Sequence, residues 1–249
     1  INLNLGYENA DKVNVFIPCQ MDMFSPMVSS SVFNILEKIG VEPLYNKDQT
    51  CCGRCLYMQG ETELVRSLAN NLLSQMDYTY PTIVPTTACV SFIKSHYKDL
   101  LENIAVPSEC KIFVQQVYEL CYYLVKIKKI TCLGNHFEHR VFYFKSCSAR
   151  NYYKLENEPE ILLQNTKGLD LLVDESLNLC CGANGNFATT NPEASDKLLE
   201  QIVENIYKKG VQYITSTDIE CLQHIEAYLS SHNLGIEVIH IADILNSGL

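Results

Sequence analysis

The stretch Thr50-Cys51-Cys52-Gly53-Arg54-Cys55 decides the organisation of the chain, because a second Cys-Cys-Gly follows 129 residues later, at Cys180-Cys181-Gly182. Each copy has one cysteine upstream, with 31 and 32 intervening residues, and one downstream, with 36 and 39. These flanking cysteines are Cys19 and Cys89 in the first half and Cys147 and Cys221 in the second. Eight of the twelve cysteines therefore form two matching sets of four, which indicates an internal duplication.

The bulk composition is that of an ordinary globular protein. The 249 residues suit one large domain or two small ones, and 47% hydrophobic residues are enough to build a core. A net charge of -10 argues against nucleic acid or an anionic membrane as the main partner. No stretch approaches the roughly 20 apolar residues of a membrane span, and no secretory signal is visible.

Twelve cysteines leave two interpretations, disulfides in a secreted protein or metal ligands and catalytic thiols in a reducing compartment. Disulfide frameworks belong mostly to small domains with little core, and neighbouring cysteines do not easily bridge to each other. The sequence therefore favours cofactor ligation over disulfides.

Apolar runs and helical periodicity alternate along both halves of the chain. We expect helices to fill most of the segments between strands, at 26–39, 61–75, 86–97 and 118–124 in the first half and at 159–165, 192–208, 218–229 and 241–245 in the second. We expect strands at 13–17, 41–45, 82–85, 141–144, 169–173, 211–215 and 236–239.

This alternation predicts an α/β fold made of two tandem repeats related by a pseudo-twofold axis. The expected domains are residues 1–128 and 141–249, joined by a connector over 129–140. Each repeat is predicted to be a mainly parallel sheet flanked by helices, with the cysteines on loops beyond the strand ends. Ligands of open α/β sheets bind at that edge, so four thiols per repeat are expected to converge there.

Four cysteine thiolates are the usual ligands of an iron–sulfur cluster, and thiolate sulfur is soft enough to suit iron. A helix N-terminus lowers a thiol pKa, and Cys89 and Cys221 are expected at such positions. Gly53 and Gly182 allow the backbone to turn sharply and approach inorganic sulfur. The predicted ligands are Cys19, Cys51, Cys52, Cys89, Cys147, Cys180, Cys181 and Cys221.

Two alternatives to an iron–sulfur cluster remain open. Zinc also accepts four cysteines, although structural zinc sites usually take their ligands from close Cys-x2–4-Cys pairs. The cysteines would otherwise be inert residues of the core. A non-enzymatic zinc-binding or scaffold protein is therefore one hypothesis for the whole chain.

The duplicated cysteine pattern resembles the cysteine-rich CCG domain. Heterodisulfide reductases, the iron–sulfur subunits of glycolate- and glycerol-3-phosphate-oxidising enzymes, and the lactate-utilisation protein A family share that domain. The resemblance to the lactate-utilisation protein A family covers nearly the whole chain. The motifs that carry it are residues 18–26 (PCQMDMFSP), 49–53 (QTCCG), 178–182 (NLCCG) and 238–245 (VIHIADIL).

The resemblance implies a cytoplasmic subunit of a multi-protein system that oxidises L-lactate, or another 2-hydroxy acid, and yields pyruvate. Such a subunit carries electrons through up to two iron–sulfur clusters, expected to be of the 4Fe–4S type. It is inactive without partner subunits, and no residue here supplies a flavin site. The second functional hypothesis is a component of a heterodisulfide or thiol–disulfide reductase.

The chain departs from the wider CCG pattern, which ends in Cys-x-x-Cys and supplies five thiols per repeat. Thr86 and Asp218 stand where the first cysteine of that pair would be, which favours electron transfer over direct disulfide chemistry. Cys55 is an extra thiol of the first repeat and a candidate substitute ligand, whereas Asn184 takes its place in the second.

The remaining candidates are weaker. Cys110, Cys121 and Cys132 have no counterparts in the second repeat and are expected to be core or surface residues. His240 is expected either to cap the last helix or to touch a site. His136 and His139 lie in the connector and are candidates only for adventitious metal binding.

Overall fold

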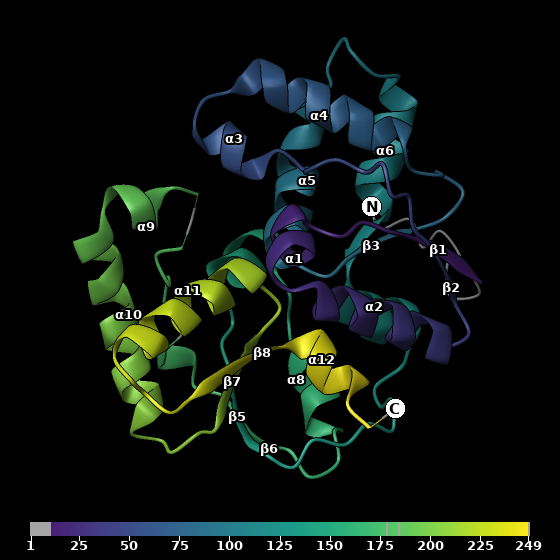
Figure 1. Cartoon of the computed structure of the whole chain (residues 1–249). Helices are drawn as coiled ribbons and strands as arrows, with labels where there is room; N and C mark the ends of the chain where they lie inside the picture. Colours follow the sequence, from purple (N-terminus) through teal and green to yellow (C-terminus); the bar gives the residue numbers. More distant parts are fainter. Residues whose placement is uncertain (1–10, 178, 184, 249) are drawn as a thin grey trace. The chain divides into compact units, whose positions relative to one another are not determined.

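The computed structural model describes residues 11–177, 179–183 and 185–248. The chain forms two compact units that divide between Thr131 and Cys132. Each unit contains one four-stranded sheet in which every strand pair is parallel. Figure 1 shows both units with their elements labelled. The predicted α/β class, with a parallel sheet and flanking helices in each repeat, is confirmed.

The sheet of the first unit has the strand order β2-β1-β3-β4. Its strands are β1 (Lys12–Val15), β2 (Glu42–Leu44), β3 (Thr82–Val84) and β4 (Val117–Glu119). The helices are α1 (Cys19–Phe24), α2 (Pro26–Lys38), α3 (Arg54–Met58), α4 (Thr62–Ser74), α5 (Thr87–Leu100), α6 (Pro107–Gln116), α7 (Leu120–Tyr122) and the π-helix η2 (Tyr123–Ile127).

The sheet of the second unit repeats this topology in the order β6-β5-β7-β8. Its strands are β5 (Arg140–Tyr143), β6 (Asp170–Leu172), β7 (Tyr213–Ser216) and β8 (Glu237–His240). The helices are the π-helix η3 (Ser148–Tyr153), α8 (Glu158–Gln164), the 3-10 helix η4 (Glu175–Leu177), α9 (Phe187–Thr190), α10 (Pro192–Tyr207), α11 (Ile219–Ser231) and α12 (Ile241–Asn246).

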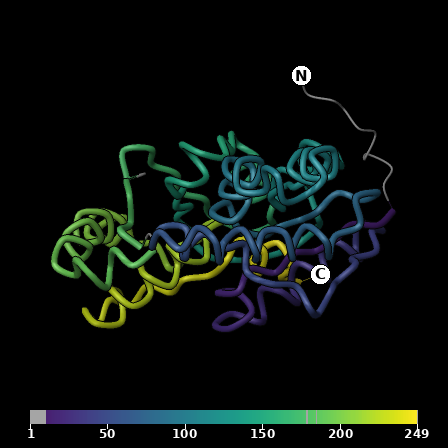
Figure 2. The backbone as a smooth tube through the Cα atoms, turned by 90° about the horizontal axis from the view of Figure 1, so that it is seen from above, coloured from purple at the N-terminus to yellow at the C-terminus, as the bar shows by residue number. Residues whose placement is uncertain are grey.

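Helices cover both faces of each sheet, which explains why the central strands read as continuous apolar runs. In the first unit α4, α5 and α6 pack on one face and α2 on the other, and in the second unit α10 and α11 lie opposite α8 and α12 (Figure 1). Figure 2 follows the same path from the purple strand β1 to the yellow helix α12. The side chains of Val13, Ile83, Phe142 and Ile214, on the central strands, are completely buried.

The helix expected over 118–124 is wrong in its first part, because Val117–Glu119 forms the fourth strand β4. Val117 and Glu119 are completely buried, and Val84 pairs with Glu119 at the edge of the sheet. The helix begins only at Leu120, where the Glu119 side chain accepts a hydrogen bond from the backbone N–H of Tyr122. A strand and a helix of three residues each are too short to show a period in their apolar residues, so the sequence pattern did not distinguish them.

His240 is a helix cap, one of its two predicted roles. Its ring Nδ1 accepts a hydrogen bond from the backbone N–H of Ala242 over 3.2 Å, at the start of α12. Glu119 holds the same position at the end of β4 in the first unit. Both final strands therefore lead into a helix that is capped by the last strand residue.

Among the described residues, none of the helices combines the length and the apolar character needed to cross a bilayer.

Replacing Phe142 with alanine is expected to lower the free energy of unfolding by about 3–5 kcal/mol, because it opens a cavity in the packed core. Phe142 lies on the central strand β5, between Leu172 and Ile214, and is completely buried. Denaturant unfolding followed by circular dichroism measures the change. Val173→Ala is the control, since that side chain is 39% exposed and is expected to cost little. A loss below about 1 kcal/mol for Phe142→Ala would contradict this packing.

Candidate functional site

All eight cysteines of the two sets follow the carboxyl ends of parallel strands. In the first unit Cys19 begins α1 after β1, Cys51 and Cys52 lie between β2 and α3, and Cys89 lies in the first turn of α5 after β3. The second unit places its four cysteines in the same way, after β5, β6 and β7. Because these strands are neighbours in one parallel sheet, their ends meet at a single edge.

The four thiols of the first unit meet as two contacting pairs. Cys19 Sγ lies 3.4 Å from Cys51 Sγ, and both side chains are partly exposed; we call these two residues the outer pair. Cys52 Sγ lies 3.2 Å from Cys89 Sγ, and both residues are buried; these two form the inner pair. A further hydrogen bond joins Cys51 to Cys52, so the four sulfur atoms form one continuous group.

The second unit repeats this arrangement. Cys181 and Cys221 form a buried inner pair with their Sγ atoms 2.8 Å apart. Cys147 hydrogen-bonds to Cys180 in the outer pair, where Cys180 is exposed. None of the twelve cysteines, all of which lie in the described part of the chain, forms a disulfide. Both predicted sets of four are therefore brought together.

One thiol in each outer pair is strongly acidified. The hydrogen bond from Cys19 lowers the pKa of Cys51 to about 3, and contacts from Cys52, the Gly53 N–H and Arg54 add to this effect. In the second unit the hydrogen bond from Cys147 lowers the pKa of Cys180 to about 6. The same bonds, together with burial, raise the pKa of Cys19 and of Cys147. Each outer pair therefore favours one thiolate and one thiol, and the thiolate is the form that binds metal.

The glycine of each Cys-Cys-Gly turns its backbone N–H toward the outer sulfur. Gly53 N lies 3.4 Å from Cys51 Sγ, and Gly182 N lies 3.5 Å from Cys180 Sγ. Both glycines adopt left-handed backbone conformations, with φ of +85° and +79°, which side chains rarely tolerate. These conformations place a hydrogen-bond donor beside the thiolate.

A helix packs closely against the glycine of each loop, α4 in the first repeat and α10 in the second. The residues that make this contact differ between the repeats. A Cβ on Gly53 would lie 3.0 Å from Val65 Cγ1, and the Tyr97 hydroxyl donates to the Cys52 carbonyl over 3.0 Å. A Cβ on Gly182 would lie 2.6 Å from Ser195 Oγ. Ser195 Oγ donates to the Gly182 carbonyl over 3.3 Å.

In the second repeat Ser195 also contacts a histidine. Ser195 Oγ and His224 Nε2 lie 2.7 Å apart, and Ser195 is completely buried. Partial burial lowers the pKa of His224, which favours its neutral form. Sequence reasoning missed Ser195 and His224, because they lie 13 and 42 positions beyond Gly182 and become neighbours only when α10 packs on α11.

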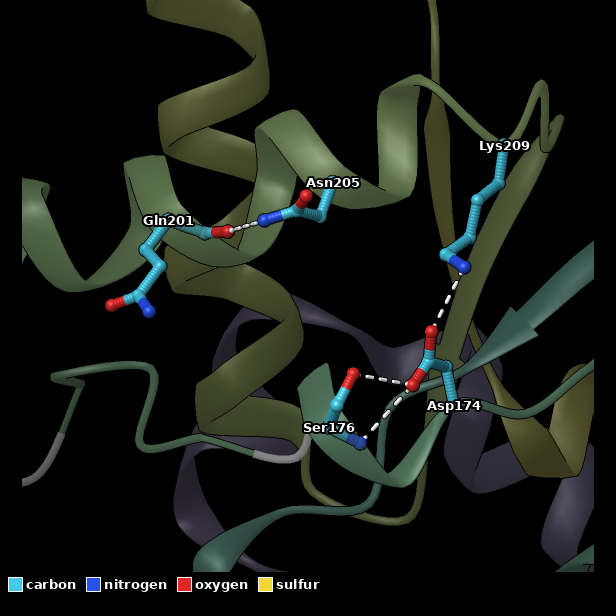
Figure 3. A network of polar contacts seen from close by, with 5 residues as sticks. All are labelled: Asp174, Ser176, Gln201, Asn205 and Lys209. Carbon is cyan, nitrogen blue, oxygen red and sulfur yellow. Dashed lines mark hydrogen bonds and ion pairs between the residues drawn. The ribbon is translucent and has the colours of Figure 1, made fainter.

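The segment that leads to the second Cys-Cys-Gly is anchored by Asp174 (Figure 3). Lys209 Nζ donates to Asp174 Oδ2 over 2.8 Å, and Ser176 donates to Asp174 Oδ1 through both its N–H and its hydroxyl. The bonds from Lys209 and Ser176 lower the pKa of Asp174 to about 2. In the same view Asn205 Nδ2 donates to the Gln201 carbonyl within α10.

The other sequence candidates fall into two groups. Cys55 lies close enough to Cys51 and Cys89 for their charges to add to the rise in its pKa, which is mainly due to burial. Cys110 and Cys121 are buried and Cys132 is exposed. The thiols of Cys110 and Cys132 donate to the backbone carbonyls of Tyr97 and Asn165. Asn184, the second-repeat counterpart of Cys55, lies outside the described residues.

The connector histidines have ordinary polar partners. His136 Nε2 lies 3.0 Å from Glu138 Oε1, and His139 Nδ1 lies 3.4 Å from Gln212 Oε1. Within residues 11–177, 179–183 and 185–248, no three His, Cys, Asp or Glu side chains take up an arrangement that would hold a single metal ion. The thiols of each set instead contact one another in pairs.

The donor chemistry of each set nevertheless fits an iron–sulfur cluster. Each set offers four soft thiol ligands, one of them acidified in the outer pair, and a backbone N–H aimed at sulfur. Ligation by the remaining thiols would release the protons that now join the sulfur atoms.

Comparison with known proteins finds a family profile and full-length relatives that are similar to this chain. Residues 13–94 and 141–226 match the sequence profile of a family described as "CCG: Cysteine-rich domain". "Lactate utilization protein A" from Bacillus pumilus (strain SAFR-032) is 28% identical over 236 residues, which cover 95% of this chain and 99% of that protein. "Lactate utilization protein A 2" from Bacillus cereus (strain AH820) is 28% identical over 239 residues, with coverages of 96% and 99%.

Among solved structures, a hypothetical protein from Helicobacter pylori is similar with a TM-score of 0.58 and 14% identity. The match covers 94% of this chain and 48% of that one, so the chain spans about half its length. At this identity the likeness supports the fold alone.

Gly53→Ala is expected to destabilise the protein more than Gly60→Ala, although both glycines have nearly the same φ, +85° and +86°. Left-handed strain alone costs about 1–2 kcal/mol and applies to both. The added methyl group at position 53 also meets Val65, whereas nothing lies within 4 Å at position 60. We expect a further loss of about 1–3 kcal/mol from this overpacking, measured by denaturant unfolding.

The double variant Gly53→Ala/Val65→Ala provides the check. Truncating Val65 makes room for the alanine side chain at position 53. We therefore expect the double variant to be free of the steric part of the loss in stability, although truncating Val65 has a cost of its own. Equal destabilisation by Gly53→Ala and Gly60→Ala would show that the loop does not approach α4 as closely as described.

Proposed function

The chain belongs to the cysteine-rich CCG domain family, and from this premise we propose that it is an electron-transfer protein with one iron–sulfur cluster in each repeat. The observation that carries the proposal is the convergence of four thiols at the carboxyl edge of each sheet. Thiols that are more than 30 residues apart in sequence meet there twice, in the same outer and inner pairs.

The residues that would hold the clusters are Cys19, Cys51, Cys52 and Cys89 in the first repeat and Cys147, Cys180, Cys181 and Cys221 in the second. A bound 4Fe–4S cluster supplies one-electron redox chemistry. The buried inner pairs hold one side of each set away from water, and the partly exposed outer pairs leave the other side accessible. The Gly53 and Gly182 N–H groups stabilise negative charge on the outer sulfur atoms.

We further propose that the electrons come from a 2-hydroxy acid, with L-lactate the first candidate. Relatives that match nearly the full length of the chain carry the name lactate utilization protein A. Oxidation of lactate to pyruvate removes two electrons and two protons. Partner subunits in the cytoplasm would perform that step, and this chain would accept the electrons one at a time.

Two other functions would give different analytical results. A component of a heterodisulfide or thiol–disulfide reductase would reduce a disulfide substrate as the isolated protein. A zinc-binding scaffold would contain stoichiometric zinc and show no redox signal.

Cys52→Ala and Cys181→Ala are each expected to remove about half of the iron and acid-labile sulfide, since each variant destroys one set of four ligands. Iron and sulfide analysis after anaerobic purification and reconstitution measures the loss. Cys110→Ala is the matched control, because Cys110 is also buried but belongs to neither set, and it is expected to keep the full content. A colourless wild-type protein without iron after reconstitution would overturn the proposal, as would the same iron content in all three variants.

A further inference from the structure

The two thiol sets differ at one buried position that has the same place in both repeats. Thr86 precedes the first residue of α5, and Asp218 precedes the first residue of α11. Each lies three residues before the downstream cysteine, Cys89 or Cys221, and both are buried, with exposures of 2% and 1%. A neutral side chain in the first repeat is therefore replaced by a carboxyl group in the second.

A second position changes together with the first. Ser146 directly precedes Cys147, and its hydroxyl donates to Asp218 Oδ2 over 2.9 Å. The Ala149 N–H donates to the same hydroxyl over 3.1 Å. The residue before Cys19 in the first repeat is Pro18, which offers no hydroxyl. The Asp218 carboxylate is thus held between the loop that carries Cys147 and the helix that carries Cys221.

Asp218 lies within electrostatic reach of one thiol of each pair in the second repeat, Cys147 of the outer pair and Cys221 of the inner pair. A negative charge at this position opposes the arrival of an electron at a cluster held by these thiols, because reduction adds negative charge to the cluster.

Each set also has one basic residue nearby. Arg54 lowers the pKa of Cys51, and Arg150 lowers the pKa of Cys180, so each set has one arginine within electrostatic reach. His224 adds no compensating charge near neutral pH, because burial lowers its pKa. Glu220, directly before Cys221, is a further acidic residue of the second repeat, since Ala88 holds that position in the first, but its side chain is only partly buried. Asp218 is a fully buried acidic side chain by which the second set differs from the first.

We propose that Asp218 lowers the reduction potential of the cluster in the second repeat, so that the two repeats of one chain hold clusters of different potential. This inference rests on the proposed function. The potential of an iron–sulfur cluster depends on net charge and on the hydrogen bonds around it. Water screens a completely buried carboxylate poorly, so its effect on a neighbouring cluster is strong. The role is one of electrostatic tuning, with the eight cysteines as ligands.

The test uses the full chain with a single loaded repeat, so that the signal is assigned without ambiguity. Cys52→Ala leaves only the second set, and Asp218→Asn is added to this parent. We expect the iron content to stay unchanged. At a fixed applied potential, the ratio of reduced to oxidised cluster is expected to rise about tenfold, an upward shift of about 59 mV for one electron. Redox titration followed by electron paramagnetic resonance measures the midpoint.

Two matched controls separate the buried charge from other effects. Glu226→Gln removes a negative charge from an exposed position on the same helix, α11, and is expected to leave the midpoint unchanged. Thr86→Asp in a Cys181→Ala parent adds the charge to the first set and is expected to lower its midpoint, whereas Thr86→Asn is expected to leave it unchanged. This second pair tests the inference even if Asp218→Asn does not fold.

The outcomes are distinguishable. A Cys52→Ala parent without iron would overturn the proposed function itself. An iron-loaded parent whose midpoint does not move in Asp218→Asn, together with no shift in Thr86→Asp, would overturn the role of Asp218 alone. Loss of iron from an Asp218→Asn variant that keeps the parent's circular dichroism spectrum would also overturn it, because the carboxylate would then be needed to hold the cluster. Where that variant does not fold, the Thr86→Asp and Thr86→Asn pair decides. An upward shift with full iron content, absent in Glu226→Gln, would establish it.

Discussion

Parallel pairing of one central strand with two neighbours is the constraint on which both thiol sets depend. β1 pairs with β2 and β3, and β5 pairs with β6 and β7, so three carboxyl strand ends meet at one edge of each sheet. Every cysteine of a set lies in the segment that follows one of these ends. A single antiparallel strand would carry its cysteines to the opposite edge and leave the set incomplete. The sheet therefore assembles a site that no local sequence motif contains.

Within that frame, close approach of the backbone determines the electrostatics of the thiols. Gly53 and Gly182 adopt conformations that point an N–H group at the outer sulfur, and the helix behind each loop leaves no room for a side chain. The repeats keep this geometry but support it differently, with Val65 in the first and Ser195 joined to His224 in the second. The repeats also differ in charge, because the second has the buried carboxyl group of Asp218 where the first has the neutral Thr86. Duplication thus preserved the arrangement of the sulfur atoms while the residues around them diverged.

The sequence was sufficient to predict the α/β class, the central strands and the long helices α4 and α10, because buried strands and amphipathic helices have clear periods. It did not show β4, whose three residues lie in a short apolar run that also continues into a helix. The short helices α1, α3 and α9 have too few turns for an apolar stripe. Cysteine spacing identified which thiols would meet, but their division into outer and inner pairs depends on packing. Ser195 and His224 could not be found because their neighbours are distant in sequence.

X-ray absorption at the iron edge of the anaerobically isolated protein tests most directly whether the thiol sets hold clusters. The expected spectrum shows sulfur as the only nearest neighbour of iron, with a second shell of iron atoms. We expect it in the wild-type chain and in the Cys52→Ala and Cys181→Ala variants, each of which keeps one set of four thiols. A sulfur shell found only at the zinc edge would contradict the assignment. Iron bound mainly by oxygen or nitrogen would contradict it equally.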